Sequence, residues 1–254
     1  MNKTQAYWQY VIFSSQTALR SRVAGSYLGY LWWFLDPLLL MLVYILVFDI
    51  ILQRGKPNFP VFLFAGLLPW KWFSGVLLQS TGSIRGRMNI IEQIAIPKYI
   101  FPLIELVVQS FLLLIGFFLI LIMMIFFKLP WTLHLLELFF VLGVNSLLLY
   151  GLALFTSHWG VFFIDIKNIL NIIVRLWFYL TPVFYDLANL PERLRFYWWC
   201  NPMTTMIESY RNIFIYGRSP YYSQLLIWLG ISLLLIISGI SLQEKYSNQY
   251  AKVK

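Results

Sequence analysis

Long uninterrupted apolar runs limit this chain to folds that can bury them in a lipid bilayer. A helix needs about 20 consecutive apolar residues to cross the hydrocarbon core of a membrane. Six segments of the sequence approach or exceed that length, at about 31–52, 60–83, 101–127, 132–157, 166–185 and 222–242. We therefore expect an all-α integral membrane protein with six transmembrane helices.

The charge balance supports a membrane protein and argues against a nucleic-acid-binding one. Only 11% of the 254 residues are charged, whereas ordinary soluble domains have about 25%. The net charge is +9, but the basic residues are scattered at the ends of apolar runs, where they contact lipid headgroups. The single cysteine, Cys200, excludes a disulfide or a thiolate metal cluster within one chain, and we expect no metal site.

The distribution of Lys and Arg predicts the orientation of the spans. An even number of spans places both termini on one side of the membrane. The segments on the side of the termini carry ten Lys and Arg residues, against seven on the other side. Basic residues are enriched in cytoplasmic loops, so we expect a multi-pass membrane protein with both termini in the cytoplasm.

Residues 1–30 are predicted to form an amphipathic helix in the plane of the membrane interface. Apolar side chains recur at helical spacing from Tyr7 to Leu19, while polar ones fill the opposite face. Asp36-Pro37 then has the pattern of a helix cap followed by a first-turn proline. A functional carboxylate at Asp36 is the alternative to this capping role.

A polar island at 84–100 separates the second and third apolar runs. Asn89 and Glu92 have the spacing of a helix cap with an acid at the third helical position, and Pro97 ends the predicted helix. A short capped helix of this kind, at about 86–97, suits docking of a cytoplasmic partner better than catalysis.

The segment 186–221 is too polar to span and unusually aromatic for a loose loop. We expect short re-entrant helices between the fifth and sixth spans, because backbone at membrane depth must be helical or covered by protein. A surface layer of amphipathic helices is the alternative.

Recognisable catalytic motifs are missing from the sequence. The two histidines, His134 and His158, stand at opposite ends of one predicted span, and no nucleophile or zinc motif occurs. No phosphate-binding P-loop is present either. We therefore expect a chain that is not an enzyme by itself and does not hydrolyse ATP.

Polar and aromatic side chains inside the predicted spans are candidates for a substrate path. A stripe from Asp165 through Arg175 to Tyr179 follows helical spacing, and Lys71 lies in mid-span. Such residues are costly in a bilayer unless they form ion pairs, face an anionic substrate or snorkel to the interface. Aromatic rings can stack on sugars, although many of them are interface or packing residues. The candidates are Trp70, Lys71, Trp72, Arg175, Trp177, Tyr179 and Tyr185.

Several short motifs, taken in order, resemble the permease subunits of ABC-2 type polysaccharide exporters. They run from Tyr27-Leu-Gly-Tyr-Leu-Trp32 and Asp36-Pro37 to Thr181-Pro182 and Asn201-Pro202. Between these lie Gly66-Leu-Leu-Pro-Trp70, Ile96-Pro97, Phe101-Pro102-Leu103 and Phe163-Ile-Asp165. The resemblance covers nearly the whole chain and implies that 31–254 forms an ABC-2 type transmembrane domain.

The resemblance also implies partners, cofactors and roles. It implies a homodimer, two copies of a separate P-loop ATPase that holds ATP and Mg²⁺, and a polysaccharide carried on a lipid diphosphate. The implied contacts with the ATPase are the N-terminal helix and Arg85, Arg87, Asn89, Glu92, Pro97 and Lys98. The implied outer gate is the re-entrant segment with Thr181, Pro182, Asn201 and Pro202.

Two alternatives to polysaccharide export stay open at this point. One is a small-molecule or drug exporter of the same superfamily, and the other is a membrane glycosyl- or acyltransferase. Glu105 and Glu137 are too isolated in the sequence to supply the paired carboxylates that such a transferase needs. Within the leading interpretation, the Tyr-Leu-Gly-Tyr-Leu-Trp-Trp motif and the tail Asn248-Gln-Tyr-Ala251 favour teichoic acid as the polymer over O-antigen or capsule.

Overall fold

The computed structural model describes residues 3–51, 58–89, 96–187 and 190–250, and this part of the chain is helical without strands. Its α-helices are α1 (Lys3–Val23), α2 (Trp32–Ile45), α3 (Phe59–Ser80), α5 (Ile100–Phe126), α6 (Leu138–Phe162), α7 (Ile166–Tyr179), α8 (Glu192–Trp199), α9 (Pro202–Arg211) and α10 (Tyr222–Tyr250). Shorter helical segments are η1 (Gly29–Leu31), η2 (Leu46–Ile51), η3 (Arg85–Arg87), η4 (Leu133–Glu137) and η6 (Asn212–Tyr216). The all-α class is confirmed.

Four helical segments are long and apolar enough to cross a membrane: Phe59–Ser80, Ile100–Phe126, Leu133–Phe162 and Tyr222–Tyr250. They correspond to the second, third, fourth and sixth predicted spans. The other two predicted spans are shorter as α-helices. α2 has 14 residues before the π-helical η2 begins, and α7 also has 14 residues. The described residues thus support four spans, and six spans remain a prediction.

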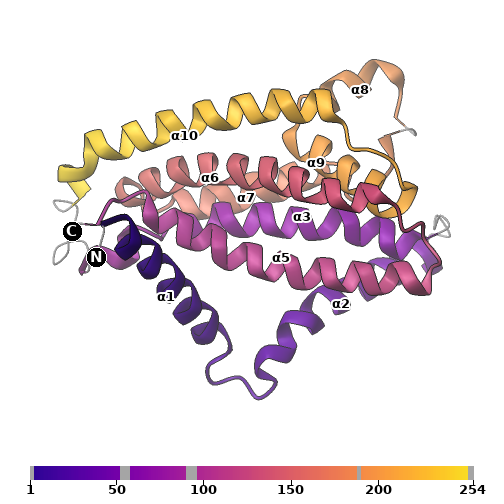
Figure 1. Ribbon diagram of the computed structural model, residues 1–254, viewed down its shortest axis with the longest axis horizontal. Coiled ribbons are helices and arrows are strands. Elements are labelled where there is room, and N and C mark those ends of the chain that lie inside the picture. Colours follow the sequence, from indigo (N-terminus) through magenta and orange to yellow (C-terminus); the bar gives the residue numbers. More distant parts are fainter. Residues whose placement is uncertain (1–2, 52–57, 90–95, 188–189, 251–254) are drawn as a thin grey trace.

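The long helices run side by side along the long axis of the molecule, with α3 inside the bundle (Figure 1). Helices α5 and α6 pack against α3, and α10 packs against α6 on the outside. In the most apolar part of α3, 78% of the residues are buried, against 17% in α10. An apolar helix that leaves most of its surface uncovered is suited to contact with lipid tails, so α10 is the peripheral span and α3 the central one.

Glycines allow α6 and α10 to approach closely along their contact. A Cβ atom added at Gly151 would lie 2.8 Å from Cβ of Leu235, and one at Gly239 would lie 2.8 Å from Cβ of Leu154. Small residues at helix crossings are a recurrent device in membranes, where close van der Waals packing replaces the hydrophobic driving force. Both positions therefore exclude larger side chains.

The N-terminal helix α1 packs one side against α5 and leaves the other side uncovered. Val11 is buried, and Tyr7 and Leu19 contact the same apolar cluster. Trp8 and Phe13 are 56% and 69% exposed. The sequence correctly predicted a helix here. Its position in the membrane interface stays a prediction, with which the uncovered apolar residues are compatible.

A sharp elbow joins α1 to α2 and gives the two helices the shape of a V (Figure 1). Gly25 and Gly29 in this elbow have φ angles of +80° and +49°. Such left-handed conformations are readily adopted only by glycine. The helix α2 begins at Trp32 after Leu31 and contains Asp36 and Pro37 in its interior. The predicted helix-capping role of Asp36 is therefore wrong.

The start of α1 and the end of α10 lie at the same end of the bundle (Figure 1). There Val11 and Tyr250 join Ile84 and Ile96, two apolar residues of the 84–100 island, in one buried cluster. The segment with α8 and η6 lies at the opposite end. The described residues implied to contact the ATPase and the segment implied to form the outer gate are thus at opposite ends of the molecule.

The predicted re-entrant segment contains two short helices, α8 and α9, followed by η6. Every residue of α9 is buried, and this helix packs against α3, α6 and α10. A layer of surface helices would leave one face of α9 exposed, so that alternative is wrong for α9. The re-entrant path itself remains a prediction.

Candidate functional site

Arg87, in the segment predicted to contact the ATPase, is tied to the span α5. Its Nη2 atom donates to Oε1 of Glu105 at 2.9 Å, and its Nη1 atom donates to the carbonyl oxygen of Ser83 at 3.0 Å. The side chains of Arg87 and Glu105 are 21% and 12% exposed. A movement of η3 would therefore act directly on α5 through a largely buried ion pair.

The other predicted contact residues are only partly covered by the described structure. Met88 and Asn89 are helical, so Asn89 does not precede this helix as the cap that was predicted. Glu92 lies in 90–95, outside the described residues. Pro97 and Lys98 line a cavity of about 250 Å³ together with Gln243 and Glu244 of α10.

Removing one member of the Arg87–Glu105 pair is expected to destabilise the chain by about 2 kcal/mol. This value lies between about 1 kcal/mol or less for exposed pairs and 3–5 kcal/mol for fully buried ones. Arg87→Gln and Glu105→Gln should each lower the thermal unfolding temperature of the purified chain. The double variant should lose less than the sum of the single losses, and strictly additive losses would contradict direct pairing.

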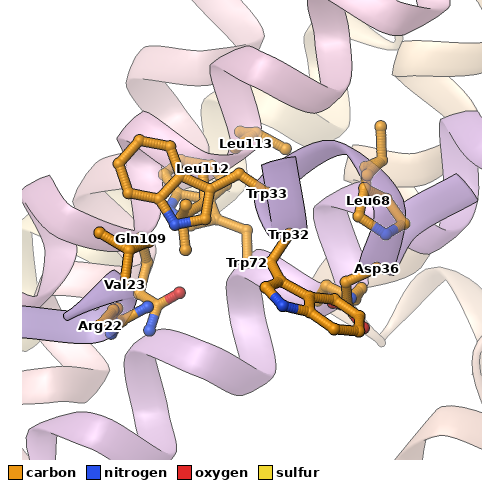
Figure 2. A pocket seen from close by; sticks show the side chains of 12 residues that line it. Arg22, Val23, Trp32, Trp33, Asp36, Leu68, Trp72, Gln109, Leu112 and Leu113 are labelled. Atoms are coloured by element: carbon orange, nitrogen blue, oxygen red, sulfur yellow. The ribbon is translucent and has the colours of Figure 1, made fainter. Parts of the chain in front are cut away.

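A second ion pair joins the elbow region to the central span. Nζ of Lys71 donates to Oδ2 of Asp36, and the two side chains are 36% and 66% exposed. The ion pair considered as one interpretation of Lys71 is therefore present, and its position inside the membrane stays a prediction. The pair stands at the edge of a cavity of about 360 Å³ lined by residues of α1, α2, α3 and α5 (Figure 2).

Trp70 and Trp72 face different surroundings, so the predicted path residues do not form one cluster. Trp72 lines the cavity beside Lys71. Trp70 instead packs against the rings of Trp177 and Phe178 of α7, with centroids 6.5 and 5.5 Å away. The substrate-path candidates thus separate into a group beside α2 and a group beside α7.

The polar stripe on α7 is largely uncovered. Val174 is the only buried residue of this helix, and Arg175 and Tyr179 are exposed. Arg175 makes no ion pair with another described residue, so pairing within one chain is not observed for it. One side of α7 packs on α3 through Trp177 and Phe178, and the exposed remainder of the helix has surface available for a partner or a substrate.

The predicted gate residues meet where α7 ends and α9 begins. Nδ2 of Asn201 donates to Oγ1 of Thr181 at 2.8 Å, and Oδ1 of Asn201 accepts from the backbone N–H of Met203 at 3.0 Å. Asn201 therefore caps α9 and holds the end of α7 at the same time. Asn201 and Pro202 also line a cavity of about 340 Å³ with Trp177 and Trp198. Nearby, Nε1 of Trp198 donates to Oη of Tyr185 at 2.8 Å.

Arg211 belongs to a Tyr-Arg motif of the predicted short helices, but sequence reasoning did not include it among the candidate site residues. Its guanidinium is fully buried and donates to the carbonyl oxygens of Phe62, Pro182 and Val183 and to Oε1 of Glu208. It also lies 3.5 Å from the ring centroid of Phe62. Sequence reasoning counted Arg211 among the loop charges. The i,i+3 spacing from Glu208 was the available signal for a helical ion pair.

The two histidines have separate structural partners, as their positions in the sequence predicted. His134 contacts Glu137 at 3.0 Å. The Nδ1 atom of His158 lies 2.6 Å from Oη of Tyr250, within a group of aromatic rings between α6 and α10. In the described part of the chain, no group of three His, Cys, Asp or Glu residues could hold a metal ion.

Comparison with known proteins covers nearly the whole chain. Residues 10–215 match the family described as ABC-2 type transporter. The chain is 31% identical over 241 residues to an O-antigen export system permease protein, RfbA, of Myxococcus xanthus, which covers 93% of this chain and 92% of that protein. It is 27% identical to RfbA of Klebsiella pneumoniae, over 92% and 91% of the two chains. The polysialic acid transport protein KpsM of Escherichia coli is 24% identical over 78% of each chain.

Proposed function

This chain belongs to the ABC-2 type transporter family, and we propose that it is the membrane subunit of an ATP-driven polysaccharide exporter. Its substrate is a polysaccharide on a lipid diphosphate, moved from the cytoplasmic side across a bacterial plasma membrane. The observation that carries this proposal is the similarity over more than nine tenths of the chain to permeases named for O-antigen export. Similarity limited to one short motif would support a shared function much less strongly.

The names of the relatives favour an O-antigen or a capsule-like polymer. Two permeases named for O-antigen export and one protein named for polysialic acid transport are similar to this chain. Teichoic acid, favoured by two short sequence motifs, remains a prediction that rests on those motifs alone.

The energy source of the proposed exporter is a separate ATPase, present in two copies with ATP and Mg²⁺. The sequence contains no P-loop, so hydrolysis needs a second protein. Arg85, Arg87 and Lys98 lie at the end of the bundle that also contains the start of α1. The ion pair between Arg87 and Glu105 supports this end as the docking surface, because it links the surface to a span. We propose that this end is cytoplasmic.

A homodimer is proposed because α7 has too few partners within one chain. Its apolar residues Ile172 and Leu176 are 61% and 62% exposed, next to the polar stripe with Arg175. A second copy would cover the apolar residues and leave the polar stripe beside a central path. Tyr179, Tyr185 and the cavity near Asn201 lie toward the proposed outer gate.

Co-purification tests the partnership. The chain, expressed with the ATPase encoded beside it, is expected to form a complex with two copies of each subunit, measured by native mass spectrometry. Hydrolysis of ATP by this complex should rise when a lipid-linked glycan is added.

The charge reversal Glu92→Lys should remove most of this stimulation, because Glu92 belongs to the short helix at about 86–97 that is predicted to dock the ATPase. Glu192→Lys is the matched control, since Glu192 is an exposed acid at the start of α8, at the opposite end of the molecule. A chain that purifies without an ATPase, or equal stimulation in both variants, would contradict the proposed coupling.

A further inference from the structure

The cavity beside the Asp36–Lys71 pair has the size of a site for a small group. Its volume of about 360 Å³ is near the lower end of the roughly 300–1,000 Å³ that ligand pockets occupy. It is formed where the elbow between α1 and α2 faces α3 and α5. Figure 2 shows Arg22 and Gln109 on one side of the cavity and Trp32 and Asp36 on the other. A headgroup fits this space, whereas a polysaccharide chain does not.

Hydrogen-bond donors dominate the polar lining of this cavity. Arg22 and Lys71 contribute a guanidinium and an ammonium group, and Gln109 contributes an amide. Trp72 is 2% exposed, and its indole N–H has no hydrogen-bond partner among the described residues. Buried N–H groups are normally paired. A ligand oxygen at the floor of the cavity would supply the missing acceptor after a small movement of the ring.

Arg22 differs from the other cations near the cavity, because no carboxylate of a described residue forms an ion pair with it. Lys71 is paired with Asp36, and Arg87 is paired with Glu105. Arg22 makes no ion pair with a described residue. Its electrostatic interaction with Glu105 acts over a distance longer than that of an ion pair. Burial of part of its side chain lowers the pKa of Arg22, and the charge of Glu105 partly offsets this effect. An arginine nevertheless stays charged in proteins, so the cavity has a net positive charge and an unpaired guanidinium.

Exposed leucines lie on α2 beyond the residues that line the cavity. Leu39 and Leu42 are 50% and 56% exposed on this helix, and Leu114 on the facing helix α5 is 55% exposed. Leu112 and Leu113 form the apolar side of the cavity itself. A ligand with a negative headgroup and a hydrocarbon chain would therefore find matching surfaces in the right order.

We propose that this cavity binds the phosphate or diphosphate group of an anionic lipid whose hydrocarbon chain lies along α2. Arg22 is the main contact, because its fork of N–H donors matches phosphate oxygens. Lys71 and Gln109 supply further donors, and Asp36 opposes binding by its charge. Identifying the ligand as the diphosphate of the carrier lipid rests on the proposed function. The binding site itself follows from the donors and the charge.

The proposed site predicts that removing a positive charge weakens lipid binding and that removing a negative charge strengthens it. Both effects are measured on the purified full chain in detergent. With a radiolabelled polyprenyl diphosphate as probe, Arg22→Gln is expected to weaken binding at least tenfold. Asp36→Asn is expected to strengthen binding severalfold, since it frees Lys71 and removes the one negative charge of the lining. Arg20→Gln is the matched control, an exposed arginine in the same last turn of α1 but outside the cavity. Unchanged binding in both Arg22→Gln and Asp36→Asn would overturn the proposal.

Competition experiments identify the source of the phosphate group. Unlabelled polyprenyl diphosphate should displace the probe at the lowest concentration. Displacement by phosphatidylglycerol at the same concentration would support the lipid site and assign it to membrane phospholipid. Equal displacement by inorganic pyrophosphate would overturn the role of the hydrocarbon chain. None of these measurements uses ATP or a partner protein. A failure of transport therefore leaves them unaffected, and a failure of binding leaves the proposed export function standing.

Discussion

Replacing Arg211 by methionine is expected to abolish accumulation of the folded protein in the membrane. The buried guanidinium donates to three backbone carbonyl groups, two of which are in the turn after α7, and to Glu208. Methionine fills a similar volume but leaves these acceptors without their donor. Removing one partner of a buried ion pair typically costs about 3–5 kcal/mol, a large fraction of the stability of most proteins. The measurement is the yield of monodisperse protein and its unfolding temperature in detergent.

Two further variants test whether the loss comes from the buried network of Arg211. One is a control at an exposed arginine, and the other also removes the charge of Glu208. Arg218→Met, at an exposed arginine in the same segment, should leave the yield unchanged. The double variant Glu208→Gln with Arg211→Met should recover part of the loss, because it removes the buried negative charge. It should not recover all of it, since the carbonyl oxygens of Pro182 and Val183 stay without their donor. A normal yield of Arg211→Met would show that the network does not stabilise the fold.

Gly160→Ala is expected to be the most damaging glycine-to-alanine substitution among the glycines that the structure describes. A Cβ atom at Gly160 would lie 1.8 Å from the carbonyl oxygen of Thr81 and 2.7 Å from its carbonyl carbon. A flexible side chain could rotate away, but here the obstacle is backbone, so α6 must move away from the end of α3. Overpacking typically costs about 1–3 kcal/mol, and we expect the upper end of this range or more. Thermal unfolding of the purified variant measures the effect.

Gly143→Ala is the matched control for Gly160→Ala, because it lies on the same helix. An added Cβ at Gly143 meets nothing within 4 Å. Alanine is favoured over glycine in a helix by up to about 1 kcal/mol, so this variant should be neutral or slightly stabilising. Equal unfolding temperatures for the two variants would show that the contact between Gly160 and Thr81 is looser than described.

The sequence predicted the helical bundle well because hydropathy and helix length are local properties. The predicted spans 60–83 and 101–127 agree closely with Phe59–Ser80 and Ile100–Phe126. Membrane backbone must satisfy its own hydrogen bonds, so an apolar run of this length has few alternatives to a helix. The shorter helices α2 and α7 show the limit of this reasoning. Their apolar runs are long enough to span, but where the α-helix ends depends on packing and on backbone breaks.

The candidate site was harder to predict because its contacts join residues far apart in the sequence. Asp36 matched the pattern of a helix cap, but its partner Lys71 is 35 positions away. Arg211 reaches the carbonyl oxygen of Phe62 over a separation of 149 residues. Lys71 was selected as a candidate from its cost in a membrane; the structure shows its ion pair with Asp36, and its functional role stays a prediction. The contribution of Arg22 became visible only when the elbow placed α1 beside α5.

Transport of a lipid-linked glycan in sealed vesicles tests the central claim most directly. Vesicles would contain this chain, its ATPase and a lipid-linked O-antigen-type glycan, with ATP on the side of the ATPase. The measured quantity is the fraction of glycan that becomes accessible to an impermeant lectin on the opposite side. We predict a rise that depends on ATP and disappears when the ATPase cannot hydrolyse it. ATP hydrolysis without movement of the glycan, or movement of hydrophobic drugs alone, would contradict the account.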